Sequence, residues 1–223
     1  MDKRQRHSNL RFALTLAASL LPACASAEYP FYFQLDLEQQ RIPLAGGSRL
    51  DVGTFGITYR EYLTPGTGLD LRIGRLGVEH KQDNTALGYS PAGYYAGLGF
   101  TTHTPSNQRV QGGLDLNYNY YYSSEAQNSD TLEVNWTQGE ARLWGALRLG
   151  GRFKLYGCAF ALNLSGDQTL KGTTPSQQTL DNRDSGGGCA GLVLETADHG
   201  VIGIEGSGGA RQGGRVYFGR DFR

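Results

Sequence analysis

The stretch Val78–Asn84, VEHKQDN, holds the residues of this sequence that are best suited to acid–base chemistry. It brings one histidine, His80, close in sequence to two carboxylates, Glu79 and Asp83. A histidine titrates near neutral pH, so beside an orienting acid it can act as a general base. His80 and Asp83 are therefore the candidates for catalysis. A solvated histidine at a strand end explains the same residues without chemistry, and it is the interpretation we favour.

The other histidines do not complete a metal site. His103 and His199 are far from His80 in sequence, whereas a structural metal needs three or four ligands held together. The glycine-rich stretches Ser185–Gly188 and Gly206–Gly214 resemble phosphate-binding loops only in composition, because neither precedes a predicted helix. We therefore expect no metal and no cofactor.

Two cysteines, Cys158 and Cys189, flank the longest polar link of the chain. Facing residues of an antiparallel hairpin have a constant index sum, which here centres the hairpin between Thr173 and Thr174, in the middle of that link. The two cysteines can therefore face each other. Apart from Cys24, which lies in a predicted N-terminal export signal, these are the cysteines of the sequence, and an even count in an exported chain predicts a disulfide, worth roughly 3–4 kcal/mol for a loop of this length. Two buried free thiols are the alternative.

The elements that would position these residues are strands. In Arg109–Tyr122, RVQGGLDLNYNYYY, the even positions are apolar or aromatic apart from one glycine, and the odd positions are almost all polar. A period of two is the strand repeat, because successive side chains point to opposite faces. The same alternation recurs in about ten segments, among them Glu28–Glu38, Gly93–Thr104 and Thr131–Trp136. The sequence predicts an all-β fold.

Two segments change phase beside a glycine. The apolar positions pass from even to odd numbers across Gly53, and from odd to even numbers across Gly74. A β-bulge inserts one residue into a strand, so it would restore a continuous apolar face at such a point. We therefore expect bulges at both glycines.

The connections between the segments alternate in length. Short turns separate long polar links, which are Glu38–Ser48, Lys81–Pro91, Ser123–Asp130 and Ser165–Gly188. Short turns at one end and long loops at the other are typical of an outer-membrane barrel. The sequence therefore predicts a closed antiparallel transmembrane β-barrel of about ten strands. Eight strands are the alternative, if two of the segments belong to loops.

The composition of the two faces favours a membrane barrel over a soluble one. The apolar face, which includes Leu132, Val134 and Trp136, is rich in aromatic residues, as at a membrane interface. Charges on the polar face would be costly in a soluble core but can pair inside a narrow lumen. We favour lumen-filling ion pairs over a solute pathway. The predicted lumen charges are Asp70, Arg72, Arg109, Asp115, Glu133, Arg142 and Arg148.

The N-terminus has the layout of an export signal. Four basic residues, Lys3, Arg4, Arg6 and Arg11, precede the apolar stretch Phe12–Ala23, and small residues ending at Ala27 complete an A-x-A cleavage site. Residues 1–27 are thus a predicted secretory signal peptide, and residues 28–223 the predicted barrel; lipidation of Cys24 is a rival outcome. Without residues 1–27 the chain has a net charge of about −3, which does not suit nucleic-acid binding.

Across residues 28–223 the sequence resembles small bacterial outer-membrane β-barrel proteins, in its pattern and its termini. Its last strand is similar to the aromatic signal that the barrel assembly machinery recognises, through Val216, Phe218 and Phe222. It departs from that signal by ending in Arg223 and by placing Arg220 in the apolar phase. The resemblance implies a location in the bacterial outer membrane, with membrane lipid, lipopolysaccharide and the assembly machinery as partners.

Three functions fit these observations. The first is a barrel without enzymatic activity, serving surface interaction or envelope integrity. The second is an enzyme on the same scaffold, acting on lipid A or peptides with His80 as its base. The third is a narrow channel for small solutes. We favour the first, and the sequence indicates neither a ligand nor an oligomeric state.

Overall fold

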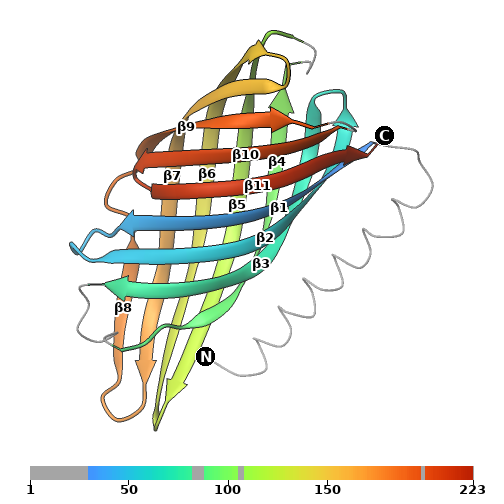
Figure 1. Ribbon diagram of the computed structural model, residues 1–223. Helices are drawn as coiled ribbons and strands as arrows, with labels where there is room; N and C mark the ends of the chain where they lie inside the picture. Colours follow the sequence, from blue (N-terminus) through green and yellow to red (C-terminus); the bar gives the residue numbers. More distant parts are fainter. Residues whose placement is uncertain (1–29, 82–87, 105–107, 197–198, 223) are drawn as a thin grey trace. The chain divides into compact units, whose positions relative to one another are not determined.

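The computed structural model describes residues 30–81, 88–104, 108–196 and 199–222, which lie in one unit, Pro30–Phe222 (Figure 1). These ranges contain no helix long and apolar enough to cross a membrane. They form eleven strands: β1 Phe31–Pro43, β2 Arg49–Thr64, β3 Thr67–Lys81, β4 Ala92–His103, β5 Val110–Gln127, β6 Asp130–Gly150, β7 Phe153–Lys171, β8 Ser176–Asp181, β9 Gly186–Glu195, β10 Gly200–Gly209 and β11 Gln212–Phe222.

Ten of these strands close into a ring. Each strand from β1 to β7 pairs antiparallel with the next, β7 pairs with β9, and β9, β10 and β11 lead back to β1. The closing pair runs from Phe31 opposite Phe222 to Arg41 opposite Gln212. β8 is not one of the ten: it pairs with the Ser165–Leu170 part of β7, and its last residue, Asp181, accepts a 2.9 Å backbone hydrogen bond from Ala45 in the link after β1. The prediction of a closed antiparallel barrel of about ten strands is confirmed, and eight strands are excluded.

The two ends of the barrel differ. We call the end where β1 begins and β11 finishes the terminal end, and the opposite end the distal end. β5, β6 and β7 are 18, 21 and 19 residues long, whereas β9 and β10 have 10 each, so the long strands extend past the short ones at the distal end (Figure 1). Most of the polar link predicted at Ser123–Asp130 is therefore strand, and its turn is only Asn128–Ser129.

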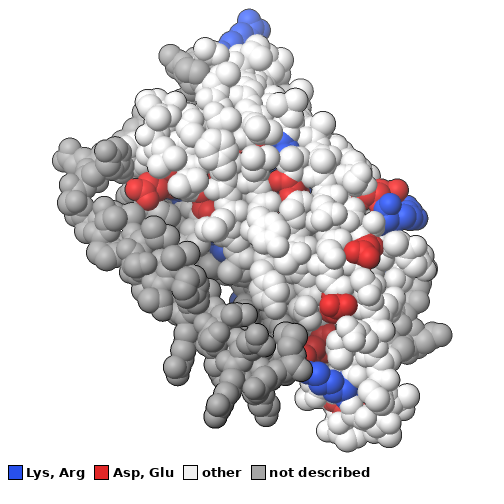
Figure 2. Space-filling view, turned by 180° about the vertical axis from the view of Figure 1, so that it is seen from behind, with Lys and Arg blue, Asp and Glu red and all other residues white. Residues whose placement is uncertain are grey.

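The outer wall is apolar along most of the ring. Large hydrophobic side chains are exposed along most strands, among them Leu98, Leu143 and Val110, each about two-thirds exposed. The segment Arg109–Tyr122 has the two faces that its alternation predicted. Tyr118 and Tyr120 are exposed on the outer face, and Asn119 is buried in the lumen. Most of the surface in the space-filling view is uncharged (Figure 2). This wall suits a lipid surrounding rather than water.

At the distal end the two faces exchange character. Here the side chains that point inwards are apolar and almost fully buried, and we call them the distal core: Ile42, Leu44, Leu50, Val52, Leu76, Val78, Leu132, Val134, Trp136, Leu164 and Leu180. The outer residues of the same strands are polar, such as Arg41, Asp51 and Glu133. This part of the barrel is therefore organised as a water-soluble β-protein, with an apolar interior.

The exchange of faces explains the phase changes at Gly53 and Gly74. The pairing of β2 with β3 runs without a shift through Gly53 opposite Gly77 and Gly56 opposite Gly74, and its single irregularity lies at Tyr62/Thr64. The bulges predicted at both glycines are thus wrong. The strands stay in phase while the apolar side chains move from the outer to the inner face.

The same exchange corrects the interpretation of Thr131–Trp136. Leu132, Val134 and Trp136 were expected to face lipid, but they are at most 1% exposed and lie in the distal core. Glu133, expected in the lumen, therefore points outwards, where its carboxylate pairs with Lys171 at 2.5 Å. Alternation alone defines two faces, and only the barrel decides which is inside.

Several predictions fall outside the described residues. These are the signal peptide of residues 1–27 with cleavage at Ala27, the lipidation of Cys24, and Asp83. Arg223 also lies outside them, whereas Arg220 is described and exposed on the outer face of β11, with its guanidinium 5.4 Å from the centre of the Phe222 ring.

Candidate functional site

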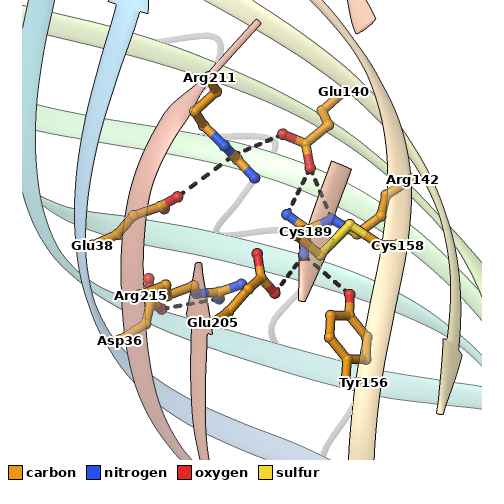
Figure 3. A network of polar contacts seen from close by, with 10 residues as sticks. All are labelled: Asp36, Glu38, Glu140, Arg142, Tyr156, Cys158, Cys189, Glu205, Arg211 and Arg215. Atoms are coloured by element: carbon orange, nitrogen blue, oxygen red, sulfur yellow. Dashed lines mark hydrogen bonds and ion pairs between the residues drawn. A yellow bond between two sulfur atoms is a disulfide. The ribbon is translucent and has the colours of Figure 1, made fainter. Parts of the chain in front are cut away.

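A network of charged side chains fills the lumen within the apolar-walled part of the ring (Figure 3). Arg142 on β6 is its centre. The guanidinium lies 2.9 Å from the Glu140 carboxylate and 3.2 Å from the Glu205 carboxylate, and it donates a 3.4 Å hydrogen bond to the hydroxyl of Tyr156. Three strands, β6, β7 and β10, are thereby tied together across the lumen.

A second arginine extends the network toward the distal end. Arg211 lies in the link between β10 and β11, and its side chain is 4% exposed. Its Nη1 is 2.8 Å from Glu140 and 3.5 Å from Glu38, and its guanidinium lies over the ring of Phe160. A link that looked like a glycine-rich loop in the sequence therefore places an arginine inside the barrel.

The network balances its charges and leaves little space. Arg215 adds an ion pair with Asp36 at 3.7 Å (Figure 3). The cavity enclosed by this network measures about 30 Å³, enough for about one water molecule. Four arginines, namely Arg72, Arg142, Arg211 and Arg215, balance Asp36, Glu38, Glu140 and Glu205. In this zone the lumen is plugged by its own side chains.

Further ion pairs lie toward the terminal end. Arg60 holds Asp70 through two hydrogen bonds of 2.6 and 2.9 Å. Glu195 accepts Arg148 at 3.0 Å and Lys154 at 2.5 Å. A guanidinium that meets a carboxylate with two parallel bonds fixes the relative position of the strands that carry them. These ion pairs therefore close a second zone of the lumen, which lies nearer the terminal end than the network around Arg142.

The structure places most of the predicted lumen charges inside the barrel. Asp70, Arg72, Asp115, Arg142 and Arg148 point inwards, and Asp115 accepts a 2.6 Å hydrogen bond from the hydroxyl of Thr101.

Two predicted lumen charges lie elsewhere. Arg109 is exposed in the link before β5, and Glu133 is on the outer wall. The partners that the prediction missed include Glu140 and Glu205, which alternation could have found, and Arg211, which it could not, because Arg211 lies outside a strand.

Cys158 and Cys189 form a disulfide inside the network (Figure 3). They are direct partners in the pairing of β7 with β9, and their Cα atoms are 4.9 Å apart. Paired residues of β7 and β9 have the same index sum that the sequence predicted for a hairpin centred between Thr173 and Thr174. The disulfide therefore joins β7 to β9 beside Arg142, although β8 interrupts the hairpin between them.

His80 belongs to a separate constellation in the distal core. Its Nδ1 lies 2.6 Å from Oε1 of Gln168 on β7, and its Nε2 lies 3.0 Å from the hydroxyl of Ser48, which precedes β2. Nδ1–H therefore donates to the amide oxygen, and Nε2 accepts from Ser48. Glu79 cannot orient His80, because adjacent strand residues point to opposite faces. Gln168, which is 88 residues away in the sequence, orients His80 instead.

This arrangement has the geometry of a nucleophile, a base and an orienting group. A serine hydroxyl bonded to a histidine, which is held in one tautomer by a third group, is the arrangement that activates serine for acyl transfer. Ser48, His80 and Gln168 are, however, all less than a tenth exposed. The same bonds equally satisfy three polar groups inside an apolar core.

The other two histidines among the described residues, His103 and His199, lie at the terminal end. His103 Nδ1 donates a 2.8 Å hydrogen bond to the carbonyl oxygen of Thr104, and its ring lies 6.3 Å from that of Trp144. His199 adopts a left-handed backbone conformation, with φ of 60°. Among the described residues, no three His, Cys, Asp or Glu side chains come together in a way that could hold a metal ion.

Comparisons with known proteins give matches to solved structures but to no family model. No curated protein matches the sequence either. Among solved structures it is similar to bacterial outer-membrane β-barrels. With the outer membrane protease OmpT from Escherichia coli, the identity is 9%, the TM-score is 0.45, and the match covers 88% of this chain and 95% of that one.

Two further solved structures match over most of the chain. The translocator domain of autotransporter NalP from Neisseria meningitidis is 12% identical with a TM-score of 0.47, covering 99% of this chain and 98% of that one. The COG4313 outer membrane channel from Pseudomonas putida F1 is 10% identical with a TM-score of 0.44, covering 89% and 97%. A protease, a translocator and a channel differ in function, so none of their activities transfers to this chain.

Proposed function

We propose that this protein is an integral barrel of the bacterial outer membrane with a closed lumen, and that its distal end serves surface interaction or envelope integrity. The observation that supports the proposal is the exchange of faces along single strands. Where the wall is apolar the interior is charged, and where the wall is polar the interior is apolar. One chain thus has one zone built for lipid and one built for water.

The orientation and assembly of the barrel follow from the same features. The distal end faces the outside of the cell, because the short turns of such barrels lie in the periplasm. Residues 1–27 direct export and are removed after Ala27. β11 presents Val216, Phe218 and Phe222 on its outer face, which suits recognition by the barrel assembly machinery. Outer-membrane lipid and lipopolysaccharide surround the wall.

The lumen network argues against the channel. Buried arginines and carboxylates in balanced numbers hold one another, and the space among them measures only about 30 Å³. A solute would have to break pairs such as Arg142 with Glu205, which join the non-adjacent strands β6 and β10. A rigid plug of this kind stabilises the barrel and keeps it closed.

Two measurements test the proposed function. The refolded protein in detergent should migrate faster on a gel before boiling than after it, since a closed barrel resists unfolding by the detergent. In planar bilayers it should give no conductance steps above those of detergent alone. A protein that is soluble and rich in β-structure without detergent would contradict the membrane location. Defined steps from a heat-modifiable protein would contradict the closed lumen.

A second candidate function is an acyl hydrolase on the same scaffold, supported by the bonds of Ser48, His80 and Gln168. In that reaction the Ser48 oxygen attacks an ester carbonyl and His80 takes the hydroxyl proton. His80 then returns the proton to the leaving alcohol, which departs from an acyl-serine. Water next adds to the acyl group and releases the acid, with His80 again as base. Gln168 would keep His80 in the required tautomer.

A fluorophosphonate probe distinguishes the two functions. We expect no covalent labelling of the folded protein, because the Ser48 side chain is buried in the distal core. The Ser48→Ala variant is the matched control, since it removes only the candidate nucleophile. Labelling of the wild type that disappears in Ser48→Ala, together with ester hydrolysis that His80→Ala abolishes, would instead establish the hydrolase.

A further inference from the structure

We infer that the outer wall carries a binding site for a phosphorylated saccharolipid with several acyl chains, built around Arg75. The inference rests on the proposed function, because it requires this wall to face the outer leaflet. The site combines a groove for an acyl chain, a cation for a phosphate group and two tyrosines for a sugar ring.

The groove lies on the outer wall over β10, β11, β1, β2 and β3, and has a volume of about 660 Å³. One row of paired outer residues forms its apolar side: Ile204, Val216, Leu37 and Phe55. The next row toward the distal end contains Gly214, Gly53 and Gly77, with the exposed Gln39 between Gly214 and Gly53. Because the three glycines carry no side chain, the wall is hollowed directly beside an apolar row. An acyl chain matches both the shape and the polarity of this groove.

Arg75 stands at the end of the apolar row, opposite Phe55 in the pairing of β2 with β3. It is exposed, and within the described ranges it forms no ion pair. An unpaired guanidinium bordering an apolar groove is complementary to a lipid with an anionic headgroup. Arginine binds phosphate with two parallel hydrogen bonds, which fixes the headgroup in place.

The row continues past Arg75 to groups that suit a sugar. Arg75 pairs with Tyr94, and Tyr94 with Tyr122, on the outer face. The two tyrosine rings are 5.6 Å apart and tilted by 39°. Their rings offer apolar faces and their hydroxyls offer hydrogen bonds, which is the combination that the membrane interface favours. Tyr122 is followed in register by Asn135 and then Asp167, whose polar groups can bond sugar hydroxyls.

The position of this row agrees with such a ligand. On β3 the outer residue before Arg75 is Ile73, which is half exposed, and beyond Arg75 come Gly77 and Glu79. On the inner face the distal core begins at Leu76. Arg75 therefore lies at the border between the apolar and polar parts of the wall, where the phosphate of an outer-leaflet lipid meets its acyl chains. The headgroup of a simple phospholipid would occupy Arg75 but not Tyr94, Tyr122 and Asn135.

Native mass spectrometry of the refolded barrel in detergent, with diphosphorylated lipid A as the probe, tests the site. Arg75→Ala should bind lipid A at least about tenfold more weakly, the loss expected for a charged hydrogen bond. Arg220→Ala is the matched control, because Arg220 also points outwards but lies at the terminal end. Arg220→Ala should bind lipid A like the wild type. Dephosphorylated lipid A and phosphatidylglycerol should each bind the wild type more weakly than diphosphorylated lipid A does.

A second variant tests the groove independently of charge. An added Cβ at Gly77 would meet no atom within 4 Å, so Gly77→Leu should fold and fill the groove. It should weaken lipid A binding while keeping heat-modifiability. Equal binding by Arg75→Ala and Arg220→Ala, or equal binding of phosphatidylglycerol and lipid A, would overturn the inference. A wild-type protein that is not heat-modifiable would instead contradict the proposed function itself.

Discussion

Replacing Arg142 by alanine is expected to lower the free energy of unfolding by about 3–5 kcal/mol. The side chain of Arg142 is only 9% exposed, and it neutralises the buried carboxylates of Glu140 and Glu205. Without Arg142, Glu205 loses the arginine that holds it at 3.2 Å, and Glu140 keeps only Arg211. An uncompensated charge in a water-poor lumen is costly, because neither lipid nor bulk water can solvate it.

Equilibrium unfolding by urea in detergent micelles measures this change, and Arg148→Ala is the matched control. Arg148 is also a lumen arginine on β6, but its side chain is 34% exposed, and Glu195 keeps Lys154 as a partner when Arg148 is removed. We expect the control to cost no more than about 1 kcal/mol. Equal losses for the two variants would mean that the network in Figure 3 does not hold the barrel together.

Replacing Trp136 by alanine is expected to cost about 3–5 kcal/mol. Trp136 is 1% exposed, and its ring stacks on Tyr121 with centroids 4.6 Å apart and planes within 3°. Tyr121 in turn stacks on Tyr95 at 5.3 Å. Tyr95 and Tyr121 line the small cavity of the charged network, and Trp136 is the distal-core residue on which Tyr121 stacks. Removing the indole therefore leaves a cavity at the level where the interior changes from polar to apolar.

Quenching by brominated lipid locates Trp136 independently of stability. The chain has two tryptophans, so the Trp144→Phe variant reports on Trp136 alone. We expect its fluorescence in brominated-lipid bilayers to stay unquenched, because the indole is enclosed by protein. Strong quenching, together with a small stability loss in Trp136→Ala, would mean that Trp136 faces lipid, as alternation suggested, and does not lie in the distal core.

Much of the fold could be predicted because a β-barrel has a local signature. Side chains of a strand alternate between two faces, so the segment Arg109–Tyr122 identifies its own faces without any other part of the chain. The pairing of Cys158 with Cys189 was also predictable, since a hairpin register depends only on residue numbers. Closure into about ten strands followed from the number of such segments.

The direction of each face was not predictable from alternation. Leu132, Val134 and Trp136 have the pattern of a lipid-facing strand, yet they form the distal core. Which face is inside depends on how the whole ring closes, and the sequence of a single strand does not reveal that. The phase changes at Gly53 and Gly74 were the signal that the surroundings change, and bulges were the wrong explanation.

The candidate site shows the same division. The sequence by itself determined that His80 is a potential base and that charges such as Asp70 and Arg142 occupy the polar face of strands. Only the tertiary structure decided their partners, because the fold brings Gln168 to His80 and Glu205 to Arg142 from distant strands. Alternation is a property of neighbouring residues, whereas a partner across the lumen depends on the closure of the whole ring.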